Sequence, residues 1–209
     1  MITLYSMPSS GNSYKVRLLL AQLSIPFRHI GTEYDHGKEL TSSPEFRKKN
    51  PAGKVPMIEF EDGRTLSESN AILLYFARGT DLLPDDPYQQ ALVHQWMFFE
   101  QNAHEGTIAV RSAILTYPHK ASQGTPEVMA SLLSGGNRAL DIMETQLAKT
   151  PFLTGDTYTV ADIALYAYTH SAGKGGFDVV NRASIAEWLS RVADQPGHVP
   201  LEWLPEGSR

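Results

Sequence analysis

The sequence changes character once, near residue 80, and this change limits the folds that the chain can adopt. Residues 1–79 alternate between short apolar stretches and amphipathic ones, in the order β-α-β-α-β-β-α, which is typical of a small unit with a mixed sheet. The stretch TDLLPDDPYQQ then brings two prolines and three acids, and nearly everything beyond it has helical periodicity. We therefore predict an α+β protein with a mixed-sheet domain over 1–79, a linker over 80–87 and an all-α helical-bundle domain over 88–209.

The expected elements follow from the spacing of apolar residues and from turn signals. Strands are expected over residues 2–5, 27–30, 57–60 and 64–66, and helices over 13–23, 44–49 and 67–78. In the second domain, helices are expected over residues 89–102, 107–115, 126–147, 160–170 and 185–194. Glu61-Asp62-Gly63 fits a hairpin turn, and Thr159 with Asp162 fits a capping box at the start of a helix.

Composition excludes several classes of function. Hydrophobic residues make up 42% and charged residues 20% of the 209 residues, as in an ordinary globular protein. The net charge of −5 leaves no basic excess for a nucleic acid backbone, so we expect no nucleic acid partner. No stretch approaches the roughly 18–20 apolar residues that cross a bilayer, and no secretory signal opens the sequence. We expect no membrane contact and a cytoplasmic location.

The chain contains no cysteine, which removes disulfides, cysteine-bound metals and any nucleophilic thiol of its own. If thiol chemistry takes place here, the sulfur must arrive with a ligand. The 7 histidines show neither H-x-x-x-H nor H-x-H spacing, so we predict no metal site.

Three short stretches could carry chemistry. Pro8–Ser13 places small hydrogen-bonding residues where the first strand turns into the first helix. Pro56 stands at the start of a strand, where it could form a rigid turn. A cis Val55–Pro56 bond would instead turn the backbone of Val55 toward a peptide-like ligand.

The third stretch, LSESNA, opens a helix whose free N–H groups and dipole favour an anion. Ser69 adds a hydroxyl donor, and Glu68 adds an anion that would suit an ammonium group. Together they suit the head group of an α-amino acid, although both are also ordinary first-turn residues that could serve only as caps.

Four motifs together resemble the glutathione transferase family over nearly the whole chain. They are YSMPSSGNSYKVRLLL, NPAGKVPMIEFEDG, LSESNAILLYFA and TYTVADIALYAY. The resemblance implies a thioredoxin-like N-terminal domain followed by an all-helical domain. It also implies glutathione as co-substrate and a homodimer with the active site near the subunit interface.

The resemblance implies a thiolate-binding residue in the first loop. In serine-type classes (delta, theta and zeta) a serine at the start of the first helix hydrogen-bonds the thiolate, and this pattern matches Ser10. Nu-type bacterial members use a threonine and an asparagine two residues apart, which matches Ser10 and Asn12. The run Gly11-Asn12-Ser13 fits none of these classes cleanly, so Ser9 stays open. Tyr5 is a further candidate, because tyrosine-type members use a tyrosine near the end of the first strand.

The same resemblance assigns the rest of the glutathione site. Val55, next to Pro56, would pair its backbone with the cysteinyl part, and Glu68 with Ser69 would hold the γ-glutamyl head. The glycyl carboxylate would meet Lys54 and a residue of the EYDHGKE loop, either His36 or Lys38. In the second domain His104, Glu105 and Arg111 lie where the family's helical domain faces its cleft, and each could instead be an interhelical partner.

The expected function is a detoxifying glutathione transferase that conjugates glutathione to a small hydrophobic electrophile. A glutathione-dependent disulfide reductase or peroxidase is the enzymatic alternative, since the nu-type resemblance allows it. A glutathione-binding protein without activity is the third hypothesis, because fold alone does not fix function.

Overall fold

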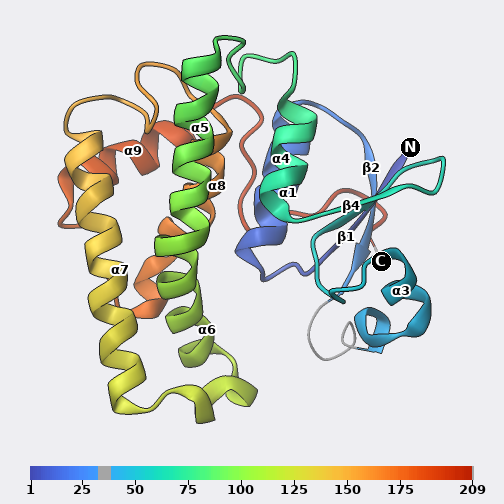
Figure 1. Cartoon of the computed structure of the whole chain (residues 1–209), viewed down its shortest axis with the longest axis horizontal. Helices are drawn as coiled ribbons and strands as arrows, with labels where there is room; N and C mark the ends of the chain where they lie inside the picture. The colour runs from blue at the N-terminus through green and yellow to red at the C-terminus, as the bar shows by residue number, and fades with distance from the viewer. Residues whose placement is uncertain (33–38, 209) are drawn as a thin grey trace. The chain divides into compact units, whose positions relative to one another are not determined.

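The computed structural model describes residues 1–32 and 39–208 (Figure 1). The chain divides into two compact units. The first contains Met1–Arg78 together with Gln195–Arg209, and the second contains Gly79–Asp194.

The first unit contains a four-stranded mixed sheet in the order β2-β1-β3-β4. The strands are β1 (Ile2–Ser6), β2 (Phe27–Gly31), β3 (Met57–Glu59) and β4 (Thr65–Ser67). β1 runs parallel to β2 and antiparallel to β3, which pairs antiparallel with β4. In the turn between β3 and β4, Gly63 has a φ of +81°, a value that glycine adopts readily. The predicted α+β class, with a thioredoxin-like sheet domain and a helical region, is confirmed.

Helices cover both faces of this sheet, because each face carries its own apolar cluster (Figure 1). The helices are α1 (Gly11–Gln22), α3 (Pro44–Lys49) and α4 (Ser69–Ala77). Val16 of α1 and Ile72 of α4 pack with Leu4 on one face. Phe46 of α3 packs with Tyr5 on the other face. Consecutive residues of β1 thus point to opposite sides, and α1 and α3 are separated by the sheet.

The C-terminal segment, residues 195–208, packs on the first unit. Tyr14 of α1 donates a hydrogen bond to the Val199 carbonyl at 2.7 Å. Trp203 lies edge-to-face against Phe27 of β2, with 6.3 Å between the ring centroids. The sequence-based division placed this segment with the helical domain instead. Its residues carry no strand or helix pattern, so nothing local indicates the unit on which they pack.

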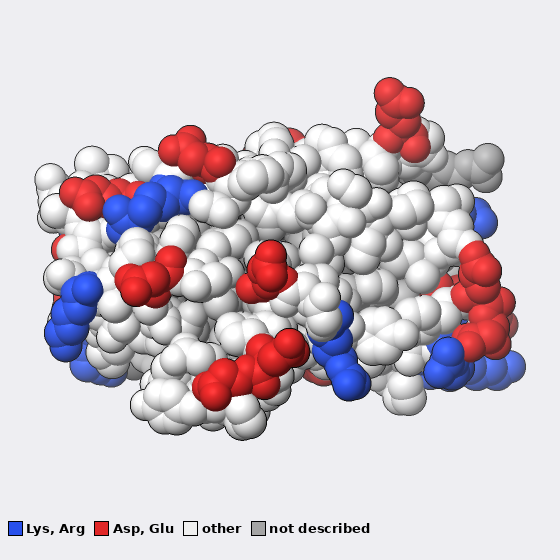
Figure 2. All heavy atoms as spheres, turned by 90° about the horizontal axis from the view of Figure 1, so that it is seen from above, with Lys and Arg blue, Asp and Glu red and all other residues white. Residues whose placement is uncertain are grey.

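The second unit is helical. Its elements are α5 (Pro87–Phe99), the π-helix η1 (Glu100–Ala109), α6 (Val110–Thr116), η2 (Pro118–Gln123), α7 (Pro126–Leu147), α8 (Val160–Thr169), η3 (Ala172–Gly175) and α9 (Ala183–Ala193). Among the helices of the described residues, none combines the length and the apolar character that crossing a membrane requires. Figure 2 shows one face of the chain, on which the acidic and basic side chains are interspersed with uncharged residues.

Two local features of this unit bear on the predictions. The capping box at α8 is confirmed, since the Thr159 backbone N–H donates to the Asp162 carboxylate at 2.9 Å. The break expected between residues 102 and 107 is wrong, because α5, η1 and α6 follow one another without a loop. Thr107 lies inside η1, where its hydroxyl donates to the carbonyls of Ala103 and His104 at 2.7 and 3.0 Å. From its sequence, Thr107 was expected to start a helix. In the structure its hydroxyl instead bonds the carbonyls of the preceding turn within a continuous helix.

Candidate active site on the first unit

Ser10 is the N-cap of α1, so the helix begins at Gly11, two residues earlier than the apolar pattern indicated. Its backbone is extended, with φ −83° and ψ 127°, and its Oγ accepts a long hydrogen bond of 3.4 Å from the Ser13 N–H. That bond uses a lone pair of the hydroxyl and leaves the O–H group itself able to donate. Ser10 is half-buried and Ser9 is exposed. The Ser10 hydroxyl thus stands at the positive end of a twelve-residue helix, where a negative charge is favoured.

A hydrogen bond joins the start of α1 to the start of α4. The Ser69 hydroxyl donates to Asn12 Oδ1 at 3.2 Å. One turn further along α1, Lys15 Nζ donates to Asn70 Oδ1 at 3.4 Å. The structure therefore brings together the first turns of two helices, which are two anion-favouring ends of the fold.

Glu68 precedes α4 in a backbone conformation that is rare for a residue with a side chain. Its φ is +70° and its ψ is 113°, and its side chain makes no capping hydrogen bond. The helix start expected at residue 67 is therefore wrong: Ser67 ends β4, and Glu68 is the N-cap. Such a conformation costs about 1–3 kcal/mol and is most often found at functional sites. The exposed Glu68 carboxylate lies next to Ser69 and is not used for capping the helix.

The loop before β3 is held by a buried asparagine that the sequence analysis missed. Asn50 Nδ2 donates to the Lys54 carbonyl at 2.7 Å, and its Oδ1 accepts from the Ala52 N–H at 3.2 Å. The Val55–Pro56 peptide bond is cis. Asn50 directly before a proline is a turn signal that could have indicated this role.

The predicted site residues of this loop differ in exposure. Pro56 is buried, Val55 packs beside the Tyr5 cluster, and the Lys54 side chain is exposed. The two remaining candidates, His36 and Lys38, lie outside the described residues.

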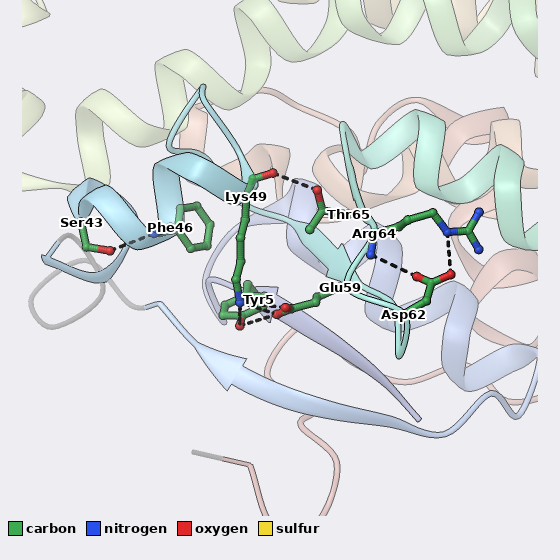
Figure 3. A network of polar contacts seen from close by, with 8 residues as sticks. All are labelled: Tyr5, Ser43, Phe46, Lys49, Glu59, Asp62, Arg64 and Thr65. Atoms are coloured by element: carbon green, nitrogen blue, oxygen red, sulfur yellow. Dashed lines mark hydrogen bonds and ion pairs between the residues drawn. The ribbon is translucent and has the colours of Figure 1, made fainter.

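Tyr5 does not lie with the α1 loop. Its hydroxyl donates to Glu59 Oε2 at 2.8 Å, and Lys49 Nζ lies 2.8 Å from both oxygens of Glu59 (Figure 3). Burial and the hydrogen bond to Glu59 raise the pKa of Tyr5. The phenol belongs to the sheet face covered by α3, whereas Ser10 begins the helix on the opposite face. The Tyr5 hydroxyl is thus engaged with Glu59 in this structure, and thiolate binding by Tyr5 stays an untested alternative to Ser10.

A second polar group missed from the sequence lies under the α1 loop. Arg17 is fully buried, and its Nη2 donates to the Pro8 carbonyl at 2.8 Å. His29 Nε2 and Ser6 Oγ share a hydrogen bond of 2.7 Å. Burial, together with the charge of Arg17, lowers the pKa of His29 to about 4, so this imidazole is neutral at pH 7. The sequence signal for this group is a charged residue, Arg17, within the apolar run VRLLL, since a charge at a buried position requires polar partners.

The ionisable residues singled out in the second unit have structural partners. Arg111 donates from Nε to the Gly175 carbonyl at 2.7 Å and from Nη1 to the Met129 carbonyl at 2.8 Å. His104 Nε2 shares a hydrogen bond of 2.8 Å with the Thr169 hydroxyl. Among the described residues, no group of three or more histidine, cysteine or acidic side chains is placed to hold a metal ion.

Two regions of the chain match models of the same protein family. A family model described as the glutathione S-transferase N-terminal domain matches residues 1–78, and one described as the C-terminal domain matches residues 126–194.

A crystal structure of a glutathione S-transferase from Pseudomonas fluorescens Pf-5 is 44% identical, has a TM-score of 0.90, and covers 96% of this chain and 98% of its own. Glutathione S-transferase F13 of Arabidopsis thaliana is 33% identical over 76% of each chain. The disulfide-bond oxidoreductase YfcG of Escherichia coli (strain K12) is 28% identical over 94% of this chain and 92% of its own.

Proposed function

Because the chain belongs to the glutathione S-transferase family, we propose that it binds glutathione on the first unit and activates its thiol. The Ser10 hydroxyl donates a hydrogen bond to the thiolate at the start of α1. The thiolate sulfur then attacks a small hydrophobic electrophile, forming a carbon–sulfur bond and expelling the leaving group. The observation that carries this proposal is the 3.2 Å bond between Asn12 and Ser69, which links the thiolate end of the site to the start of α4.

The available interactions are large enough to ionise the thiol. A free thiol has a pKa near ~8.5, and lowering it by about two units requires about 2.7 kcal/mol of preferential binding to the thiolate. A helix N-terminus contributes about 0.3–2 kcal/mol, and a hydrogen bond to a charged group contributes about 1.5–3 kcal/mol. One hydroxyl at the start of α1 is therefore sufficient, without a general base.

The other end of glutathione is an α-amino acid, and the start of α4 suits it. In the proposal, the exposed Glu68 carboxylate pairs with the γ-glutamyl ammonium group. The first N–H groups of α4 bind the γ-glutamyl carboxylate, and the Ser69 hydroxyl, which donates to Asn12 in the structure, turns its one hydrogen to that carboxylate when glutathione binds. The backbone of Val55, beside Pro56, binds the cysteinyl part, and Lys54 binds the glycyl carboxylate. His36 or Lys38 remains a proposed second partner of that carboxylate.

A second candidate is reduction of disulfides by glutathione. It is favoured by the likeness to the oxidoreductase YfcG and by the spacing of Ser10 and Asn12. Since the chain has no cysteine, the bound glutathione thiolate itself would attack a disulfide sulfur and release a thiol. A second glutathione would then cleave the mixed disulfide, giving oxidised glutathione and the second thiol. The Ser10 site serves both reactions, because both start from the same thiolate.

The test is the ultraviolet absorbance of bound thiolate across pH in wild type, Ser10→Ala and Ser9→Ala. Ser9→Ala is a matched control, because it removes the neighbouring hydroxyl and leaves the N-cap intact. We expect Ser10→Ala alone to raise the pKa of the bound thiol by about one to two pH units while glutathione affinity changes little. An unchanged pKa in Ser10→Ala would remove Ser10 from its proposed role. Turnover with an aromatic halide and with a mixed disulfide then separates the two reactions.

A further inference from the structure

The buried guanidinium of Arg17 connects two segments that are far apart in the sequence. Nη2 donates to the Pro8 carbonyl at 2.8 Å and to the Leu201 carbonyl at 2.7 Å. Nη1 donates to the Ser6 hydroxyl at 3.2 Å and to the Met7 carbonyl at 3.4 Å. Burying a charge is costly unless it is well hydrogen-bonded, so this side chain has one favoured position.

The residues that Arg17 contacts before α1 are hydrogen-bonded directly to Ser10 and its helix. The Met7 carbonyl that faces Arg17 also accepts the backbone N–H of Ser10 at 3.0 Å. The Met7 N–H in turn donates to the Ser13 hydroxyl at 3.0 Å. Arg17 therefore contacts the backbone that sets the direction of the Ser10 side chain, although it lies beneath the loop.

The other side of the guanidinium is held by the C-terminal segment, residues 195–208. Leu201 provides the acceptor, and the chain on either side of it is fixed to the first unit. Tyr14 donates to the Val199 carbonyl at 2.7 Å, and Trp203 packs against Phe27. Nη2 of the planar Arg17 guanidinium thus donates one hydrogen to the Pro8 carbonyl and the other to the Leu201 carbonyl.

We propose that Arg17, held by the C-terminal segment, is a positioning residue that fixes the Met7–Ser10 loop so that the Ser10 hydroxyl meets the thiolate. This inference rests on the proposed function, because it gives Ser10 its role in thiol activation. Arg17 itself does not touch the substrate. A planar fork is needed for this geometry, since a lysine ammonium on a flexible stem cannot bond the same set of acceptors at once.

The experiment measures the pKa of enzyme-bound glutathione thiol, together with glutathione affinity, in wild type and four variants. Arg17→Lys keeps the charge and removes the fork, and Arg17→Gln removes both. Tyr14→Phe loosens the C-terminal segment and leaves the guanidinium intact. Ile58→Val is the stability control, because it trims the buried core of the same unit at a residue of β3 that belongs to neither the loop nor the segment.

We expect both Arg17 variants to raise the pKa of the bound thiol by about one pH unit, with the dissociation constant for glutathione within about twofold of wild type. Tyr14→Phe should cause a smaller rise, and Ile58→Val none. Turnover at a pH below the wild-type thiol pKa should fall about tenfold in the Arg17 variants.

Three results would overturn the inference. The first is a bound-thiol pKa in Arg17→Lys that equals the value in wild type. The second is a rise in Arg17→Gln alone, which would assign the effect to charge rather than position. The third, if neither Arg17 variant folds, is an unchanged thiol pKa in Tyr14→Phe. Failure of the proposed function would show in the wild type, which would bind glutathione without lowering the pKa of its thiol. Failure of the Arg17 inference alone would leave that wild-type pKa lowered.

Discussion

Replacing Glu68 should separate backbone strain from ligand binding at the start of α4. A side chain at φ +70° costs about 1–3 kcal/mol, and glycine removes most of that cost. Glu68→Gly also loses about 0.3–1 kcal/mol of attraction between the carboxylate and the helix dipole. The more flexible unfolded chain costs a further ~0.5–1 kcal/mol. Since Glu68 makes no capping hydrogen bond, nothing else is lost. Central values leave the glycine variant more stable by roughly 0.5 kcal/mol.

The same substitution should weaken glutathione binding. Removing the partner of an ammonium group costs about 1–3 kcal/mol, which corresponds to about 5- to 150-fold in the dissociation constant. Glu68→Gln is the matched control: it loses the charge, keeps the strained backbone, and should bind as weakly as the glycine variant without any gain in stability.

Urea unfolding and calorimetric titration with glutathione measure both quantities on the same preparations. A glycine variant clearly less stable than wild type would refute the assignment of strain to Glu68. Unaltered affinity in both variants would remove Glu68 from the binding site.

Three other predictions concern different parts of the chain. Lys54→Ala should weaken glutathione binding a few-fold and leave the pKa of the bound thiol unchanged, because Lys54 is proposed to meet the glycyl carboxylate far from the sulfur; calorimetry and thiolate absorbance check this, and a changed thiol pKa would contradict it. Burial raises the pKa of Asp162 from 3.8 to about 6, so the folded chain binds this proton more tightly than the unfolded chain. That contribution is present below pH 3.8 and lost as pH rises through about 6, by up to about 3 kcal/mol, and Asp162→Asn should flatten this part of the urea-unfolding profile; an equal slope in both proteins would argue against it. Light scattering should give twice the 23.1 kDa chain mass, since the family resemblance implies a homodimer, and a monomer at micromolar concentration would contradict that.

Much of the fold follows from local patterns, and the exceptions have physical reasons. The order of strands and helices up to residue 78 and the capping box at α8 depend on periodicity and cap chemistry, which the sequence displays. The start of α1 was placed too late because Gly11 and Asn12 are weak helix formers, and the N-cap bond of Ser10 compensates for them. Glu68 as an N-cap could not be anticipated, because its positive φ contradicts the preference of the residue.

Within the candidate site, the sequence indicates the residues that could meet a ligand but not those that support them. Asn50 and Arg17 are polar residues whose partners are mostly backbone groups, and a backbone group leaves no mark in the sequence. Arg17 in particular depends on Leu201, which is 184 residues away along the chain. Long-range contacts of this kind require the folded structure.

Ionisation of the glutathione thiol on the wild-type protein tests the central claim most directly. Glutathione is titrated into the protein, and the thiolate absorbance of the complex is followed across pH. We predict half-ionisation about two pH units below the ~8.5 of a free thiol, as a hydroxyl at the start of α1 would produce. Bound glutathione that ionises at the pH of the free thiol would contradict thiol activation at this site.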